Sequence, residues 1–235
     1  MPARLLAVLT LLCVPCIGVA TPLDDYVAAP DDTYQFTIEN AVRGEGHGVA
    51  YTIYQVKMYS QRWRTIAEVD RPVWWHWLQI VVPDTVTNDV ALLVIEGGSN
   101  RGNPANVEPF AGILAGATGA VLALLQQVPN QPLRFSDESI DRREDAIIAY
   151  SYDKFLDTGD PTWPVLLPMV KSALRAMDTV QAVLREKSVN VERFVVGGGS
   201  KRGWTTWLTA AVDKRVMACV PIVIDVLNMR VQMDH

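Results

Sequence analysis

An alternation of period two marks the first third of the chain. Within residues 49–59, one face carries Thr52, Tyr54, Val56 and Met58, a pattern typical of a half-buried strand. Residues 34–39 predict a shorter strand, and residues 73–82, which end at a proline, predict a third. Glycines at positions 44, 46 and 48 separate the first two segments. Because the strands follow one another with turn residues between them, we expect an antiparallel opening to a sheet.

From residue 90 onward, short apolar runs alternate with helical patterns. The clearest helix covers residues 166–184, where apolar residues repeat at steps of three and four, and Lys171, Arg175 and Asp178 lie on its other side. The expected strands are residues 90–95, 119–128, the short apolar run from residue 193 that leads into the glycines at 197–199, and residues 216–224. The other expected helices are residues 104–115, 141–156 and 201–212. This order predicts an α/β fold, in which a mostly parallel sheet with antiparallel N-terminal strands is covered by helices on both faces.

The first 20 residues have the features of a secretory signal peptide. A basic residue, Arg4, precedes an apolar stretch over residues 5–12, and small residues end the segment with expected cleavage after Ala20. Pro15 interrupts the apolar stretch, which is therefore too short for a membrane anchor. We expect a secreted or periplasmic protein whose residues 21–235 form the N-terminal portion of a single domain, with residues 21–32 as an extended lead-in.

Composition narrows the classes of partner. The 235 residues include 21 Lys and Arg against 26 Asp and Glu, a formal net charge of −5, which argues against nucleic acid and anionic membranes as partners. No cluster of His, Cys and carboxylates has metal-ligand spacing, so neither a metal nor another cofactor is expected. Cys219 is the one cysteine after residue 20, either a buried apolar residue or half of a disulfide. Its apolar strand favours burial.

The strongest chemical signal is the sequence RFVVGGGSKRGW at residues 193–204. A strand enters a glycine turn and a helix follows, with Ser200 at the apex, as in the nucleophile elbow of serine hydrolases. There the amide of Lys201 would point at the group that the serine attacks. The usual pattern has glycine two residues after the serine, but here Arg202 stands there and Gly203 follows. A glycine-rich turn with Ser200 merely capping the helix is the alternative.

A second glycine pair follows the strand at residues 90–95. Gly97 and Gly98 would let backbone amides approach a ligand closely, and Gly98 is the candidate for the second oxyanion donor. A plain turn is the alternative. Since ligands bind at the carboxyl ends of parallel strands, the expected location of both Gly98 and Ser200 there favours the serine-nucleophile hypothesis.

Two other features have ordinary structural explanations. Trp74, Trp75 and Trp77 could form a stacking platform for a sugar, but aromatic residues also favour strands, and we prefer that interpretation. The charged run at residues 141–145 is expected to be the solvated start of a helix.

Several motifs together resemble a known family. They are IEGGSN (95–100), VPNQPL (128–133), REDAIIAY (143–150), GGSKRGWTTWL (198–208) and PIVID (221–225). The order of elements resembles the α/β-hydrolase fold, and the sequence resembles the PhoPQ-activated pathogenicity-related family of secreted proteins over nearly all of residues 23–235. The elbow is also similar to that of glucuronoyl esterases, where a cationic residue directly after the serine helps to hold the oxyanion. That resemblance implies a possible side-chain role for Lys201.

The catalytic partners of Ser200 are the open question. In α/β-hydrolases an acid and then a histidine follow the nucleophile, but here only His235 and three aspartates do, and Asp213 and Asp225 are not where the acid is expected. We therefore expect a C-terminally truncated chain that is inactive by itself. The full protein would be a secreted serine hydrolase acting on an unknown small-molecule, carbohydrate-ester or peptide substrate. The alternative is a non-catalytic binding or signalling protein on a hydrolase scaffold.

Overall fold

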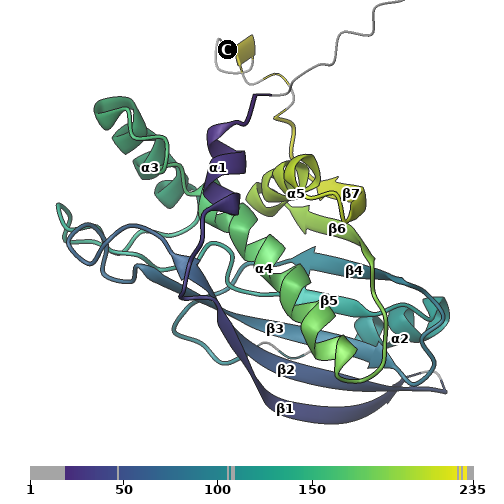
Figure 1. Cartoon of the computed structure of the whole chain (residues 1–235). Coiled ribbons are helices and arrows are strands. Elements are labelled where there is room, and N and C mark those ends of the chain that lie inside the picture. Colours follow the sequence, from purple (N-terminus) through teal and green to yellow (C-terminus); the bar gives the residue numbers. More distant parts are fainter. Residues whose placement is uncertain are drawn as a thin grey trace, which may run out of the picture.

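A twisted seven-stranded sheet organises the chain (Figure 1). The computed structural model describes residues 19–46, 48–104, 106, 109–226, 228 and 230–231. The strand order is β1-β2-β3-β5-β4-β6-β7. The strands are β1 (Gln35–Gly46), β2 (Val49–Arg62), β3 (Val73–Pro83), β4 (Val90–Ile95), β5 (Leu122–Leu125), β6 (Arg193–Gly199) and β7 (Val216–Ile222).

The sheet is mixed, with the antiparallel opening that the sequence predicts. Strands β1, β2 and β3 pair antiparallel with one another, and β3 pairs antiparallel with β5. Strands β5, β4, β6 and β7 are mutually parallel. Ile95 of β4 lies opposite both Leu125 of β5 and Gly198 of β6. The loops that follow these three strands therefore leave the sheet at one edge.

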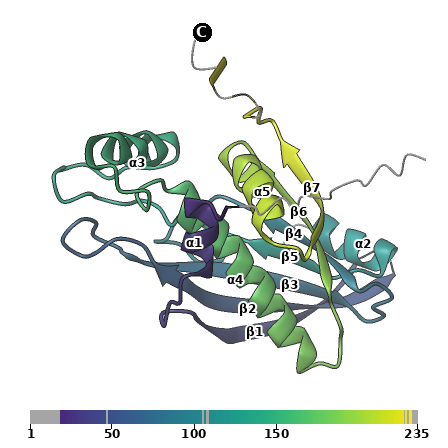
Figure 2. The same ribbon diagram turned by 45° about the horizontal axis from the view of Figure 1, so that its top comes forward.

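Helices cover both faces of the sheet, as expected from the alternation of elements. The helices are α1 (Pro22–Ala28), α2 (Pro109–Thr118), α3 (Asp145–Thr158), α4 (Leu166–Arg185) and α5 (Lys201–Val212). Figures 1 and 2 show α4 lying across one face, with α1 and α5 beside it. Helix α2 packs on the opposite face, where Tyr51, Val81, Ala111 and Ala115 form a smaller core. The larger core lies under α4 and includes Leu78, Ile80, Met177 and Val180.

The segment after residue 20 is helical, so the predicted extended lead-in is wrong. Thr21 caps α1, with its side chain accepting from the Asp24 amide and the Asp24 carboxylate accepting from the Thr21 amide. Pro22 occupies the first turn, where the N–H that proline lacks would have no partner within the helix. This reciprocal capping stabilises a short helix in a segment whose two prolines favoured an extended conformation.

Helix α1 also explains why Lys171 is buried. The sequence pattern places Lys171 on the polar side of α4, but the residue is only 3% exposed. Its ammonium donates to the carbonyl of Ala29 at 2.7 Å and to that of Tyr26 at 3.3 Å. A cation at the C-terminal end of α1 is favourable because that end carries a partial negative charge. The polar side of α4 thus packs partly against α1 and faces solvent elsewhere.

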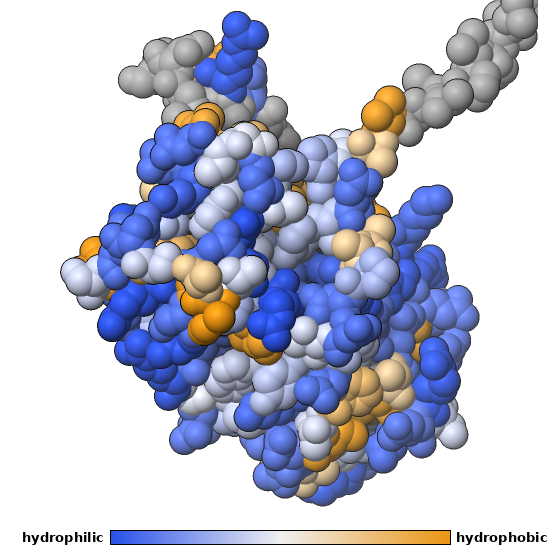
Figure 3. Space-filling view, turned by 60° about the vertical axis from the view of Figure 1, so that its left-hand side comes forward, coloured by the Kyte–Doolittle hydropathy of each residue, from blue (hydrophilic) through white to orange (hydrophobic). Residues whose placement is uncertain are grey.

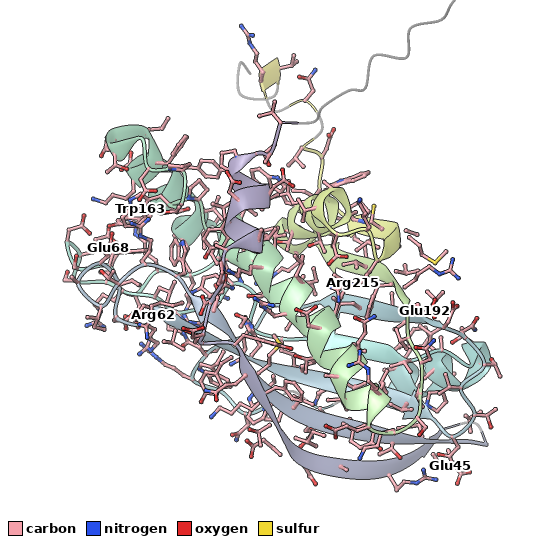
Figure 4. All side chains as sticks on the ribbon, in the orientation of Figure 1. Glu45, Arg62, Glu68, Trp163, Glu192 and Arg215 are labelled. Atoms are coloured by element: carbon pink, nitrogen blue, oxygen red, sulfur yellow. The ribbon has the colours of Figure 1, made fainter. Side chains whose placement is uncertain are left out.

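The tryptophans of β3 divide between the two faces. Trp74 is fully buried and meets Trp63 edge to face at 5.8 Å, while Trp63 also contacts Phe135 and Trp163. Trp75 and Trp77 lie on the other face, half-buried. Trp163 belongs to the segment between α3 and α4, which Figure 4 shows at the left of the view. Trp74 is therefore a core residue, as the structural interpretation of the tryptophans predicts.

Several predicted boundaries shift. Strand β1 runs on to Gly46, through part of the expected turn. Strand β5 covers only four residues because the chain turns after it at Gln127, whose φ is 64°. Helix α3 begins at Asp145 because Arg142 is held in an isolated β-bridge with Leu133. Helix α2 begins at Pro109, and residues 105, 107 and 108 lie outside the described residues.

Strand β7 forms but ends at Ile222 and not at the predicted residue 224, and its burial does not follow the prediction. Met217 and Val220 are 52% and 48% exposed, and Cys219 is a free thiol that is half-buried. Within the described residues, β7 pairs with β6 alone, so its other edge is uncovered. Arg215, just before β7, points to α4 and donates to Asp178 and Gln181 (Figure 4).

The side of the molecule that Figure 3 shows is mostly hydrophilic, with a few apolar patches. Exposed large apolar side chains in the described part include Ile66, Ile140 and Leu156. Scattered apolar residues of this kind are ordinary on protein surfaces. Among the helices that the structure describes, none combines the length and apolar character needed to cross a membrane.

Candidate active site

Ser200 occupies the turn between β6 and α5. Its backbone has φ 56° and ψ −125°, a conformation that non-glycine residues rarely adopt. Its amide donates to the Ile222 carbonyl at 2.8 Å, and its own carbonyl accepts from Trp204 to begin the helix. The residue is solvent-exposed. This is the strand, sharp turn and helix of a nucleophile elbow.

Two glycines allow β6 and α5 to pack closely around this turn. A Cβ on Gly198 would lie 2.8 Å from the carbonyl oxygen of Arg202. A Cβ on Gly203 would lie 3.0 Å from the carbonyl oxygen of Gly198 and 2.5 Å from Cγ2 of Ile224. The close approach therefore needs glycine at position 203, one residue later than the usual motif. Position 202 tolerates a long side chain, which explains the departure that the sequence shows.

The candidate oxyanion amides belong to Lys201 and Gly98, which lie beyond the carboxyl ends of β6 and β4. Lys201 is the first residue of α5, so its amide belongs to the helix end, where the first amides have no partner within the helix. Gly98 has φ 133°, which strongly favours glycine. The Gly97 carbonyl accepts from the Gln127 amide at 2.8 Å, and the Gly98 carbonyl accepts from the Gln131 side chain at 3.0 Å. The Gly97–Gly98 loop is thus fixed at the same edge of the sheet as Ser200.

The side chains after Ser200 converge on one carboxylate, that of Glu144. Arg202 donates to its two oxygens at 2.8 and 2.7 Å, and the ammonium of Lys201 lies 2.8 Å from it and 3.1 Å from Asp145. Gln131 donates at 2.5 Å. Partial burial would raise the pKa of the Glu144 carboxyl, but the hydrogen bonds from Arg202, Lys201 and Gln131 outweigh burial and lower the pKa to about 2. The carboxylate is therefore ionised throughout the neutral range.

Sequence reasoning missed Glu144. It precedes Ser200 by more than 50 residues, in a charged run expected to be solvated. The structure instead makes it the residue before α3, with φ 52° and ψ −129°. A bidentate pair with Arg202 depends on tertiary packing, and no local pattern indicates it. The one signal was the REDAIIAY segment among the motifs of the family resemblance.

Among the residues that the structure describes, no histidine lies against Ser200. His76 is the one histidine in the part of the chain that the structure describes, and it is fully buried on β3. Its ring nitrogens lie 3.0 Å from the Ser60 hydroxyl and 3.1 Å from the Gln126 carbonyl oxygen. Asp213, at the end of α5, pairs with Arg215 at 2.7 Å. His47, Asp234 and His235 lie outside the described residues.

The residues that the structure describes contain no group of three or more His, Cys, Asp or Glu side chains able to hold a metal ion. The carboxylates near Ser200 are instead paired with Lys201 and Arg202.

The sheet order, the elbow and the helices on both faces define an α/β-hydrolase-like fold, and solved structures agree. A glucuronoyl esterase from Solibacter usitatus superposes with a TM-score of 0.51 at 14% identity, covering 85% of this chain and 56% of that one. An acetyl xylan esterase from Paenibacillus sp. R4 gives a TM-score of 0.52 at 17% identity, covering 90% and 59%. At these identities the likeness establishes the fold alone.

The sequence itself places the chain more narrowly. The profile of the PhoPQ-activated pathogenicity-related protein family matches residues 23–235, so the chain belongs to that family. It is also 42% identical over 233 residues to autocrine proliferation repressor protein A of Dictyostelium discoideum, covering 98% of this chain and 46% of that protein. The chain spans about half the length of this curated relative.

Proposed function

We propose that this chain is part of a secreted or periplasmic serine hydrolase that cleaves an ester or amide through an acyl-enzyme on Ser200. The observation that carries the proposal is the backbone of Ser200, which is held at φ 56° between β6 and α5 with the residue exposed. Backbone strain of this kind persists only where the surrounding structure imposes it, and it is concentrated at functional sites. A serine that only capped α5 would accept a hydrogen bond from a helix amide, and no such cap bond is present.

The chemistry follows from the position of the amides. The Ser200 hydroxyl would attack the acyl carbon while a general base takes its proton, and the developing oxyanion would accept hydrogen bonds from the Lys201 and Gly98 amides. The leaving alcohol or amine would take that proton as the tetrahedral intermediate collapses. Water would then attack the acyl-enzyme by the same route and release the acid and free Ser200. Because His76 is committed to the core, the base and its acid would come from outside the described residues.

Lys201 contributes its amide in this scheme. Its ammonium is paired with Glu144 and Asp145, and its side chain is only 8% exposed. A direct side-chain role on the oxyanion, which the likeness to the glucuronoyl-esterase elbow implies, would require these two ion pairs to break.

The solved neighbours point to a class of substrate. The two solved neighbours are named for carbohydrate esters, glucuronoyl and acetyl xylan. We propose a small molecule, a carbohydrate ester or a peptide as substrate, and the negative net charge of −5 disfavours nucleic acid and anionic membranes. No cofactor is needed for acyl transfer of this kind.

A second candidate function has one observation in its favour. His76, the histidine that the structure describes, does not contact Ser200 and is buried among Ser60 and Gln126. A non-catalytic binding or signalling protein on the hydrolase scaffold would need no base. The name of the Dictyostelium relative, a proliferation repressor, is compatible with this alternative.

The test is labelling and turnover with the protein at its natural length, established by intact mass. A fluorophosphonate should modify Ser200, and Ser200→Ala should abolish labelling and lower ester hydrolysis by roughly 10³-fold or more. Ser188→Ala is the matched control, because Ser188 is also exposed with a positive φ of 59° but lies at the far end of α4. Turnover that survives Ser200→Ala, or absence of both labelling and turnover in the wild type, would refute the proposal.

A further inference from the structure

We propose that Glu144 is the positioning residue of this site, which locks the elbow helix α5 and the Gly97–Gly98 loop into one geometry. The inference rests on the proposed function, because the two segments that Glu144 joins are those that would supply the oxyanion amides. Glu144 itself would touch neither substrate nor the reacting atoms.

The contacts of Glu144 with α5 are strong ones. Its two carboxylate oxygens receive the two terminal nitrogens of Arg202, a bidentate pair, and one of them also lies 2.8 Å from the Lys201 ammonium. Arg202 and Lys201 have side-chain exposures of 11% and 8%, so their charges are poorly compensated by water. Charge-assisted bonds of this kind have a fixed geometry as well as a larger energy. They hold the first two residues after Ser200.

The contacts of Glu144 with the glycine loop run through Gln131. Its side-chain nitrogen donates to Glu144 at 2.5 Å and to the Gly98 carbonyl at 3.0 Å. The side-chain oxygen of Gln131 accepts from the Glu144 amide at 2.7 Å. Both ends of the Gln131 amide are thus fixed by Glu144. The orientation of the Gly98 peptide therefore depends on the same carboxylate that holds α5.

Arg202 also joins the Glu144 carboxylate to the glycine loop and to the loop after β5. Its Nε donates to the Val128 carbonyl at 2.6 Å, and an ideal Cβ on Gly97 would lie 2.7 Å from Nη2. The guanidinium group therefore lies against the backbone of Gly97 and in contact with the loop after β5. Without the Glu144 charge, this nearly buried cation would lose the carboxylate that directs it toward the glycine loop.

This arrangement bears on the rate because oxyanion donors act only at the right distance. Loss of one donor costs about 10²- to 10³-fold in kcat. A displacement of the Lys201 or Gly98 amide should therefore lower kcat and kcat/KM by similar factors and leave KM nearly unchanged. A purely structural role would instead lower stability and leave the kinetics of the folded protein intact.

The experiment compares steady-state ester hydrolysis and thermal unfolding of the natural-length wild type, Glu144→Gln, Glu144→Asp and Glu138→Gln. Glu138 is the matched control, since it forms a bidentate pair with Arg142 in the same region and does not contact the elbow. We expect Glu144→Gln to lower kcat by about 10²-fold with KM within about threefold. Glu144→Asp keeps the charge and should recover part of this loss, while Glu138→Gln should keep the wild-type kcat.

The outcomes separate the two proposals. Wild-type protein without Ser200-dependent turnover would refute the proposed function. Turnover with an unchanged kcat in folded Glu144→Gln, or an equal loss of kcat in Glu138→Gln, would overturn the positioning role alone. If Glu144→Gln fails to fold, Glu144→Asp decides: the shortened side chain cannot keep every contact, so an unchanged kcat in that variant would refute the role.

Discussion

The buried histidine of β3 gives a sharp prediction about pH and stability. His76 is fully buried, and its Nδ1 lies 3.1 Å from the Gln126 carbonyl oxygen, which only accepts hydrogen bonds. Nδ1 therefore carries the proton, and Nε2 accepts from the Ser60 hydroxyl at 3.0 Å. A second proton would break this arrangement in a dry environment. Burial accordingly lowers the pKa of His76 to about 4, although hydrogen bonds to the Gln126 and Gln127 backbone oppose the shift.

The sign and size of the effect follow from this pKa. Between the ordinary value of 6.5 and about 4, the unfolded chain binds the proton and the folded chain does not, so stability falls as pH falls. At about 1.4 kcal/mol per pKa unit, the full effect is about 3 kcal/mol, of which about 2 kcal/mol is lost by pH 5. The Glu144 carboxyl has its pKa lowered from 4.5 to about 2, so the stability it contributes is lost only below about pH 4.5. Between pH 7.5 and pH 5 the Glu144 carboxyl therefore contributes little to the change in stability.

The assay is urea unfolding at pH 7.5 and pH 5, followed by tryptophan fluorescence. The wild type should lose about 2 kcal/mol between the two pH values, whereas His76→Gln should start less stable and show a much flatter dependence. Equal pH dependence in the two proteins would refute the reasoning. An NMR titration of the His76 ring with a midpoint above pH 6 would do the same.

Two further predictions concern packing. Gly203→Ala should lower the free energy of unfolding by about 1–3 kcal/mol in urea, because the added Cβ would lie 2.5 and 3.0 Å from neighbouring atoms and this steric clash outweighs the better helix propensity of alanine. Gly199→Ala is the control: no atom lies within 4 Å of its Cβ, so stability should change by no more than about 0.5 kcal/mol. Trp63→Ala should cost about 3–5 kcal/mol, since the side chain is 1% exposed and contacts three aromatic rings. A smaller loss than that of Trp75→Ala, on the half-buried face, would contradict the assignment of Trp63 to the core.

Some features that were predicted wrongly have a local signal in the sequence. The capping box of Thr21 and Asp24 is visible in the sequence, yet two prolines in the segment favoured an extended chain. Proline is compatible both with an extended segment and with the first turn of a helix, so the prolines do not distinguish the two. The capping box does, because it is a signature of a helix start. Other errors had no local signal. Cys219 lies in an apolar run, but the burial of a strand depends on what covers it, and β7 is covered on one edge only within the described residues.

Apart from α1, the sequence by itself determined the order of strands and helices along the chain, the antiparallel opening and the elbow at Ser200. These features follow from short-range causes: the period of apolar residues and the steric freedom of glycine. Tertiary structure decided which charges meet, because pairing and burial join residues far apart in the chain. Glu144 became the partner of Arg202, Lys171 became a buried cap for α1, and His76 became a neutral core residue. Each of these roles exists only once the sheet brings distant segments within hydrogen-bond distance.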